Sequence, residues 1–294
     1  RKHEITLLAE RWHQCRRGDG QALIILGEPG IGKSRLVRQF VDGLGLSALS
    51  IRLGCDPQHA NTALFPFVEH LNMVAGIHSN EPPDIKLRRV RELLGLPDGS
   101  ESTAWLPRLL GLDSPLTVLD PGEIKKKTVD QLIRYFADIA AVQPLILIIE
   151  DAHWIDPTSA ELTLHLTIRL KAARALIVLT SRSPLHKLAP VAETVNLNRL
   201  TREETAKLVA QLAEEGTIAH DIIEQIVSRT EGVPLFVEEL TLAMRAANRE
   251  SRRKLGDDGD AAAIGSLLPA TVQESVLVRL DQLFPVKRVA KIAS

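Results

Sequence analysis

The sequence predicts an α/β fold in which a parallel β-sheet lies between helices and an all-helical segment follows. Three observations support this prediction. Strand-sized apolar runs alternate with helical patterns over the first two thirds of the chain, an order typical of parallel sheets. A glycine-rich turn directly follows the first apolar run. After the last predicted strand, which ends at Leu197, only helical patterns remain, and these indicate a lid or a second domain.

The spacing of apolar residues predicts each element in turn. Helical spacing is present over residues 4–17 and ends at Gly18-Asp19-Gly20, and it returns from Lys33 to Gly43. Continuous apolar runs predict strands at 22–26, 145–149 and 175–179. Residues 49–53 can form a further strand, and 194–197 a short fifth one. Residues 57–143 look mostly helical, and Pro157 begins a helix that runs to Leu170.

The remaining third of the chain carries helical signals only. Thr201 and Glu204 have the spacing of a capping box, which places the start of a helix there. Helical patterns follow at 218–230 and 234–248. The charged and then Gly- and Ala-rich stretch 249–265 predicts an exposed connector, and 267–294 returns to an amphipathic helical pattern.

Composition excludes several classes of protein. The 294 residues, 45% of them hydrophobic and 25% charged, suit a soluble globular protein with one large domain or one domain and a smaller appendage. The net charge of -1 does not resemble a basic nucleic-acid-binding domain. No apolar run approaches the ~20 residues of a membrane span. Cys15 and Cys55 lack metal or redox spacing. We expect a piece of a longer cytoplasmic protein that contacts neither nucleic acid nor membrane.

The glycine-rich turn matches the phosphate-loop pattern G-x-x-x-x-G-K-[ST] and lies between a strand and a helix, the context that the pattern requires. Small residues let successive backbone N–H groups surround phosphate oxygens, and the following helix presents its positive end to them. The lysine reaches the β- and γ-phosphates, and the hydroxyl ligates Mg²⁺. The sequence therefore predicts a site for ATP or ADP with Mg²⁺. Its predicted nucleotide contacts are Gly27, Glu28, Pro29, Gly30, Ile31, Gly32, Lys33, Ser34 and Arg35.

Two acids, Glu150 and Asp151, follow the apolar run 145–149. Ligands of open α/β sheets bind at the carboxyl ends of strands, so we expect these carboxylates to join Ser34 in the magnesium shell and to support hydrolysis. The usual order of such a pair is Asp at the metal and then a second acid that polarises water. The Glu-Asp order here leaves open which residue takes which role.

Three further sites each allow a functional and a structural interpretation, and a fourth residue has a structural interpretation only. His153 either reaches a phosphate or packs against the start of the next helix, and Asp156 is expected to cap that helix before Pro157. Arg182, after the fourth strand, either senses the γ-phosphate or is a surface arginine. Gly232-Val-Pro234 either breaks a helix or brings a lid helix to the nucleotide.

With these residues in view, the chain resembles the STAND class of P-loop ATPases (signal-transduction ATPases with numerous domains), which belongs to the AAA+-related group. It is most similar to bacterial modules found between class III adenylate/guanylate cyclase domains and tetratricopeptide repeats, or in large LuxR-type regulators. The motifs that carry the resemblance are Arg1–Glu4, Gly27–Ser34, Leu145–Pro157, Thr180–Arg182, Gly232–Pro234 and Leu268–Leu280.

The resemblance implies a P-loop NTPase with a five-stranded sheet of order 5-1-4-3-2, a helical lid and the start of a winged helix. The expected domains are 1–199 for the nucleotide-binding domain, 200–255 for the lid, and 256–294 for a linker and a truncated winged helix. The resemblance also places Arg1 near the adenine, Pro234 at the nucleotide, and Arg182 as a sensor. It implies a switch in which ADP holds a closed monomer and ATP releases an oligomer, with partners among the flanking cyclase, repeat or helix-turn-helix domains.

Three functions are compatible with these features. The first is a slow regulatory ATPase whose nucleotide state controls an attached output domain. The second is a phosphotransferase or motor that acts on a substrate held by the helical insert 57–143. The third is a DNA-binding regulator that uses the partial winged helix, against which the near-neutral charge of this segment argues.

Overall fold

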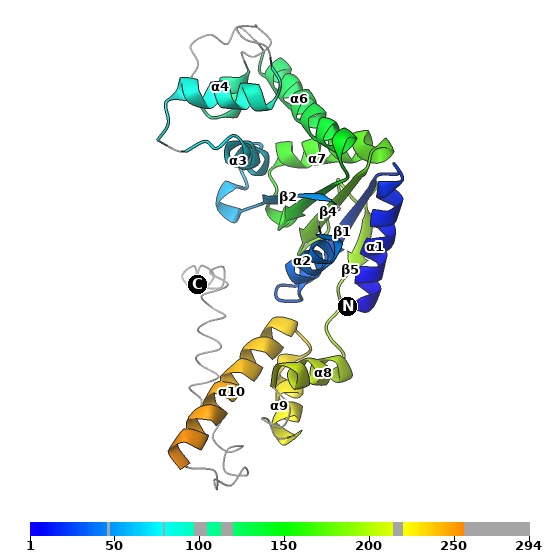
Figure 1. Ribbon diagram of the computed structural model, residues 1–294, viewed down its shortest axis with the longest axis vertical. Helices are drawn as coiled ribbons and strands as arrows, with labels where there is room; N and C mark the ends of the chain where they lie inside the picture. The colour runs from blue at the N-terminus through cyan, green and yellow to red at the C-terminus, as the bar shows by residue number, and fades with distance from the viewer. Residues whose placement is uncertain (46–47, 79, 97–104, 113–119, 214–219, 256–294) are drawn as a thin grey trace, which may run out of the picture. The chain divides into compact units, whose positions relative to one another are not determined.

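The computed structural model describes residues 1–45, 48–78, 80–96, 105–112, 120–213 and 220–255 (Figure 1). The chain forms two compact units. The first, which we call the sheet unit, comprises Arg1–Glu28 and Lys33–Leu197. The second, the helical unit, comprises Pro29–Gly32 and Asn198–Ser294 and is described as far as Leu255.

The sheet has five strands in the order β2-β3-β4-β1-β5, and all four neighbouring pairs are parallel (Figure 1). The strands are β1 (Gln21–Leu26), β2 (Leu49–Gly54), β3 (Leu145–Glu150), β4 (Ala175–Ser181) and β5 (Glu193–Asn196). Read from the other edge, this order is the 5-1-4-3-2 arrangement that the resemblance implies, and it is confirmed. Because every pair is parallel, all five carboxyl ends lie along the same edge of the sheet.

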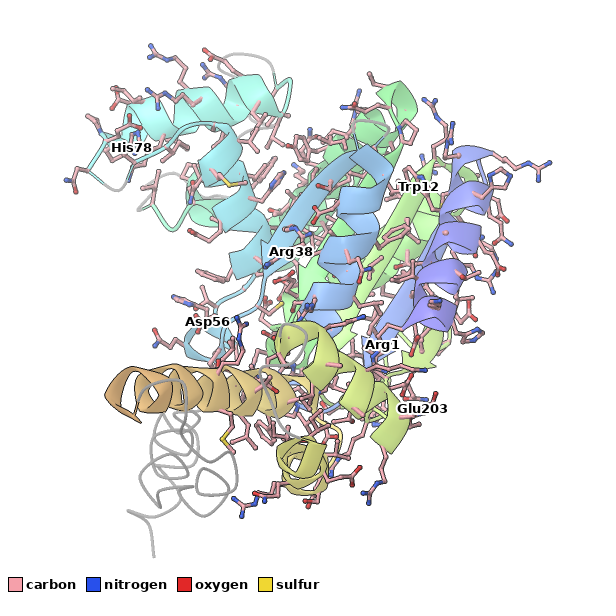
Figure 2. The ribbon with its side chains drawn as sticks, turned by 60° about the horizontal axis from the view of Figure 1, so that its bottom comes forward. Arg1, Trp12, Arg38, Asp56, His78 and Glu203 are labelled. Atoms are coloured by element: carbon pink, nitrogen blue, oxygen red, sulfur yellow. The ribbon has the colours of Figure 1, made fainter. Side chains whose placement is uncertain are left out.

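Helices α1 (Lys2–Arg16) and α2 (Lys33–Leu44) cover one face of the sheet. Helix α1 buries Leu8, Trp12 and Cys15 there, and Figure 2 shows Trp12 on the side of α1 that faces the strands, with Arg1 at the start of the helix. Helix α2 buries an apolar face of its own, headed by Lys33 in its first turn. This face of the sheet therefore carries the helix that follows the glycine-rich turn.

The opposite face is covered by the helical insert and α7 (Pro157–Arg169) (Figure 1). Within the described residues, the predicted helical character of 57–143 is confirmed: the segment forms η2 (Pro57–His59), α3 (Phe65–Val74), α4 (Pro83–Leu93), α5 (Leu106–Leu109) and α6 (Pro121–Val142). Two further short 3₁₀ helices are η4 (Ala152–Trp154) and η5 (Leu170–Ala172). The core on this side joins Phe67, Phe136 and Leu162 to Leu147 and Ile149 of β3.

The two faces of β3 are therefore distinct. Successive side chains of a strand point to opposite faces. Because Leu147 and Ile149 face the insert, Ile148 and Glu150 face the side covered by α2. This assignment decides where the first of the two acids points.

The helical unit contains α8 (Arg202–Ala213), α9 (His220–Thr230) and α10 (Pro234–Leu255). Its small core is built from Val209, Ile226, Val237, Leu240 and Met244. The predicted capping box is confirmed, since the Thr201 amide donates to Glu204 Oε2 at 2.9 Å and the Glu204 amide donates to Thr201 Oγ1 at 3.2 Å.

The prediction that an exposed connector begins at residue 249 is wrong. Helix α10 continues to Leu255 because the residues there, mostly Arg, Glu, Lys and Leu, have high helix propensity and no breaker among them. The rest of the predicted connector and the predicted winged-helix segment 256–294 lie outside the described residues. Among the described helices, none combines the length and the apolar character that crossing a membrane would demand.

Candidate functional site

The glycine-rich turn and the two acids lie at the same edge of the sheet, after strands that flank β4. The register pairs Leu26 of β1 with Ser181 of β4, and Leu179 of β4 with Ile149 of β3. Beyond the paired residues, the Gly27 amide donates to the Ser181 carbonyl at 3.2 Å, and the Asp151 amide donates to Thr180 Oγ1 at 3.0 Å. The end of β4 thus holds the main chains of both motifs.

The glycine-rich turn has the backbone conformation of an anion-binding loop. Gly30 and Gly32 have φ values of 76° and 98°, a region that only glycine enters without strain. Alternation of such residues with right-handed ones turns successive N–H groups to the same side. The turn leads directly into α2, whose N-terminal end adds positive potential.

Lys33 is a buried cation at the base of this loop. It is 7% exposed, and its ammonium donates to the carbonyls of Gly27 at 2.8 Å and Glu28 at 3.1 Å. Burial lowers the pKa of Lys33, the Asp151 carboxylate acts against this shift, and the Arg182 guanidinium adds to it. Asp151 and Arg182 therefore both lie within electrostatic reach of Lys33.

Glu150 is the last residue of β3 and points to the face covered by α2, the helix whose first turn carries Ser34 and Arg35. Its Oε1 forms an ion pair with Arg52 Nη1 of β2 at 2.8 Å. Sequence analysis missed Arg52. Its signal was a single charged residue inside the predicted strand 49–53.

Asp151 differs from Glu150 in conformation and in partners. Its φ of 51° is left-handed, which is uncommon for a residue with a side chain. Its carboxylate is 46% exposed. The two adjacent acids are thus held by different groups: Glu150 by Arg52, and the main chain of Asp151 by Thr180.

His153 lies in η4, directly after the acids. Its side chain is 8% exposed, and its Nδ1 is 3.9 Å from Asp151 Oδ1, too long for a hydrogen bond. The ring lies 5.1 Å from that of Trp154. Burial lowers the pKa of His153, while the Asp151 carboxylate acts against this shift. The imidazole therefore lies beside Trp154 and within electrostatic reach of Asp151, Arg182 and Lys33.

Asp156 is the predicted N-cap of α7, and the prediction is confirmed. The side chain is buried, and its Oδ1 accepts from the amides of Thr158 at 3.0 Å and Ser159 at 2.9 Å. The same oxygen accepts from the amide of Leu64 at 3.2 Å. One carboxylate therefore fixes both the start of α7 and the loop that leads into α3.

The glycine of the Gly232-Val-Pro234 segment has a steric role. Gly232 has a φ of 76°, and a Cβ there would lie 2.1 Å from the carbonyl oxygen of Leu200. The Leu200 amide donates to the Gly232 carbonyl at 2.8 Å. The close approach of the two main chains excludes any side chain, and Pro234 then begins α10.

The helical unit also contains the tip of the glycine-rich turn. The Leu235 amide donates to the Gly30 carbonyl at 3.2 Å, and a Cβ on Gly30 would lie 3.0 Å from the Leu235 Cβ. Pro234 is thus adjacent in sequence to a residue that contacts the turn. Arg1 lies at the start of α1, where it forms an ion pair with Glu4 at 3.2 Å.

These residues fit a nucleotide with Mg²⁺. The positive-φ glycines suit a loop with inward N–H groups, Lys33 is a buried cation next to Gly32, and Ser34 and Glu150 offer oxygen atoms on the same face of the sheet. The part of the chain that the structure describes has no group of three or more His, Cys, Asp or Glu residues able to hold a metal alone. Mg²⁺ at nucleotide sites characteristically uses one or two protein ligands together with phosphate oxygens and water.

Residues 1–179 match the family model of the AAA ATPase domain. The chain belongs to this family. The match includes the glycine-rich turn and the acids after β3.

Known proteins agree with this assignment at the level of the fold. The chain is similar to the ORC1 protein of Aeropyrum pernix in complex with DNA, with a TM-score of 0.55 and 15% identity over 94% of this chain and 65% of that one. It is also similar to a Walker-type ATPase of Pyrococcus abyssi, with a TM-score of 0.52 and 14% identity over 99% of this chain and 76% of that one.

A curated relative is longer than this chain. It is an uncharacterized protein, R02095, of Rhizobium meliloti (strain 1021), which is 25% identical over 305 aligned residues. The match covers 100% of this chain but only 29% of the relative.

Proposed function

We propose that the chain is a nucleotide-driven regulatory ATPase that binds ATP or ADP with Mg²⁺, hydrolyses ATP slowly, and controls an attached output domain. The observation that carries the proposal is the placement of Lys33. Lys33 is a buried ammonium at the base of a positive-φ glycine loop and lies within electrostatic reach of Asp151. A buried cation in this position is suited to binding a polyanion, whose negative charge balances that of the ammonium.

We assign the two acids different roles because their conformations and partners differ. Glu150 and Ser34 share the α2 face of the sheet, so we assign both to the magnesium shell. Asp151 leaves the strand in a left-handed turn, and we assign it to the water that attacks the terminal phosphate. Magnesium, when bound, neutralises phosphate charge and orients the terminal phosphoryl group. Arg182, after β4, is proposed to sense that group.

A regulatory role is supported by contacts within the helical unit. Gly30 of the phosphate loop contacts Leu235 and Val233, which flank Pro234 at the start of α10. A change in the conformation of the phosphate loop on nucleotide exchange would therefore alter these contacts with the start of α10. Such coupling is how nucleotide switches shift a population between two packings. The STAND class, with a cyclase or a LuxR-type regulator as the output, remains the specific form that we propose.

The test is an exchange of nucleotides on the purified chain. ADP- and ATP-loaded samples should differ in hydrodynamic size or in protease sensitivity. Lys33→Ala should remove nucleotide binding and this difference, whereas Lys126→Ala, an exposed position on α6, should preserve both. Identical behaviour of the two loaded forms would refute the switch, and micromolar nucleotide affinity in Lys33→Ala would refute the assigned loop.

One observation favours the second candidate, a phosphotransferase or motor. The helical insert has a cavity of about 550 Å³, lined among others by Trp105, Gln131 and Arg134. A site of this size could hold a substrate. This function requires turnover of roughly 1–100 s⁻¹ that depends on a co-substrate. A steady-state rate that does not respond to candidate phosphate acceptors or polymers would favour the regulatory role.

A further inference from the structure

Asp156 accepts one hydrogen bond more than the cap of α7 requires. The residue is 2% exposed. Its Oδ1 accepts from the amides of Thr158 and Ser159, which belong to the first turn of α7, and from the amide of Leu64. A cap needs only the first two bonds. The third, at 3.2 Å the longest of the set, joins the start of α7 to the start of α3 across 92 positions of the sequence.

Leu64 has a backbone conformation that leucine rarely adopts. Its φ of 61° and ψ of 17° are left-handed, and leucine lacks the short polar side chain that eases this region for asparagine or aspartate. Its carbonyl accepts from the amides of Phe67 at 3.0 Å and Val68 at 2.9 Å, in the first turn of α3. Such residues persist where the surrounding structure holds them, and they are common in switch regions. The bond to Asp156 therefore acts against backbone strain and fixes the start of α3.

Asp156 ends the short segment that begins at the second acid of the nucleotide site. The carbonyl of Asp151 accepts from the amide of Trp154 at 2.9 Å, and the carbonyl of Ala152 accepts from the amide of Ile155 at 3.2 Å. Because these overlapping bonds tie successive residues of the segment together, a displacement of Asp151 would also displace Asp156.

The loop between β2 and α3 is attached to this segment at both of its ends. At its start, the Cys55 amide donates to the Glu150 carbonyl at 3.0 Å, and at its end Leu64 donates to Asp156. Burial raises the pKa of the Cys55 thiol to about 12, and the carboxylates of Asp156 and Asp151 act in the same direction. Both carboxylates therefore lie within electrostatic reach of the loop that leads into the helical insert.

We propose that Asp156 couples the nucleotide state of the site to the helical insert through its bond to Leu64. The proposal rests on the regulatory ATPase function proposed above, in which Asp151 is assigned to the water at the terminal phosphate. That phosphate distinguishes ATP from ADP. In the ADP state the bond holds Leu64 in its left-handed conformation. In the ATP state Asp151 moves toward the water and Asp156 follows, so the longest of its three bonds breaks and Leu64 relaxes together with the first turn of α3.

The first measurement is hydrogen exchange of backbone amides, compared between ADP and a non-hydrolysable ATP analogue, both with Mg²⁺. The amides of Leu64, Phe67 and Val68 should exchange about tenfold faster or more in the ATP state. The amides of Thr158 and Ser159 should stay protected in both states, because the cap of α7 remains. Equal exchange at Leu64 in the two states of a chain that binds both nucleotides overturns the inference.

Two substitutions of Asp156 separate this coupling from a purely structural bond. Asp156→Asn keeps a carbonyl oxygen at the reach of Oδ1, so the difference in exchange between the nucleotide states should persist. Asp156→Ser keeps an oxygen that caps α7, but its side chain is one bond shorter and withdraws from Leu64. The start of α3 should then exchange fast in both states. Asp120→Ser, the same change at the exposed cap of α6, should behave like the unsubstituted chain.

The second measurement is the ratio of the affinities for the ATP analogue and for ADP. Coupling is reciprocal, so if ATP breaks the bond, loss of the bond must favour ATP. The ratio should shift toward the ATP analogue by about fivefold or more in Asp156→Ser, and it should stay within about twofold in Asp156→Asn and Asp120→Ser. A purely structural bond leaves the ratio unchanged in all three variants, and an unchanged ratio in Asp156→Ser overturns the inference.

A change at Leu64 tests the same coupling if Asp156→Ser does not fold. Glycine adopts the left-handed conformation without strain, so in Leu64→Gly the release of the bond no longer relieves strain. The ratio of affinities should therefore shift toward ADP, opposite to its shift in Asp156→Ser, and a shift toward ATP would contradict the coupling. Failure of the unsubstituted chain to bind either nucleotide would instead refute the proposed function.

Discussion

Arg52 on β2 and Glu150 on β3 form an ion pair across the edge of the sheet, with Nη1 2.8 Å from Oε1. The parallel register pairs Gly54 with Glu150 and Arg52 with Ile148, so the guanidinium reaches two residues along the strand, past a glycine that has no side chain. Both side chains are partly exposed, at 36% and 32%. The guanidinium thus occupies a carboxylate oxygen that we assign to magnesium.

Replacement of Arg52 should therefore strengthen magnesium binding. In Arg52→Gln, the Mg²⁺ concentration that half-saturates nucleotide binding should fall by about threefold to tenfold, while the free energy of unfolding changes by less than about 1 kcal/mol, as for other exposed ion pairs. A magnesium titration with a fluorescent ADP measures the first quantity and urea unfolding the second. Arg134→Gln is the control, because Arg134 has an exposed acidic neighbour, Asp138 at 3.9 Å. An unchanged magnesium midpoint would contradict the competition.

The two acids should respond differently to amide substitution. Glu150→Gln should raise the Mg²⁺ requirement of nucleotide binding about tenfold or more, because a charged ligand is replaced by a neutral one. Asp151→Asn should leave that requirement nearly unchanged and lower the rate of hydrolysis. Equal effects of both substitutions on both quantities would show that the pair supports the fold and not two separate roles. Parallel titrations and phosphate-release assays give the comparison.

Asp156 should contribute more to stability than an ordinary helix cap. Asp156→Ala leaves three backbone amides without their acceptor, and the expected loss is about 2–3 kcal/mol. Asp120→Ala is the matched control, because this exposed N-cap of α6 accepts from one amide, that of Gly122, and should cost about 0.5–1 kcal/mol. Urea unfolding measures both variants, and equal losses would refute a special role for Asp156.

Gly232 should not tolerate any side chain. Gly232→Ala would place a Cβ 2.1 Å from the Leu200 carbonyl oxygen at a φ of 76°, and the expected loss is at least about 2 kcal/mol. Gly43→Ala is the opposite case. Its Cβ would meet nothing within 4 Å in an exposed part of α2, and helix propensity predicts a gain of about 0.5–1 kcal/mol. Thermal unfolding of the two variants should therefore shift in opposite directions, and a neutral Gly232→Ala would contradict the close approach.

Stability should fall as the solution is acidified below the pKa of an unfolded histidine. His70 is 5% exposed, its Nε2 lies 3.1 Å from the Tyr135 hydroxyl, and burial lowers its pKa. Between this lowered pKa and about 6.5, the unfolded chain binds more protons than the folded chain, so stability rises with pH through this window and is fully present above it.

His70→Phe should flatten this dependence by up to about 1.4 kcal/mol per pH unit, the limit for one proton. Urea unfolding between pH 5 and 7.5 measures the slope. The exposed His165 provides the control variant His165→Gln, which should keep the slope of the unsubstituted chain. If His70→Phe kept the full slope, the dependence would have to come from other groups, such as the buried His153.

Much of this fold could be predicted because its signals are local. The apolar runs, the capping box at Thr201 and the phosphate loop each depend on residues close in sequence. The pairing of Arg52 with Glu150 could not be predicted, because it requires the register of two strands separated by the insert. Neither could the bond from the Leu64 amide to Asp156, which joins residues 92 positions apart, nor the left-handed turn at Asp151, which the next strand stabilises.

The bond between Thr180 and Asp151 has a consequence for variation at this site. Thr180 Oγ1 accepts from the amide of residue 151, not from its carboxylate. Asp, Asn or Gly at 151 can keep both that bond and the left-handed φ of 51°, so the shape of the strand end does not require a carboxylate there. A variant at this position can therefore lose ATP hydrolysis while it still folds and still binds its nucleotide. A single substitution would then convert an ATPase into a nucleotide receptor.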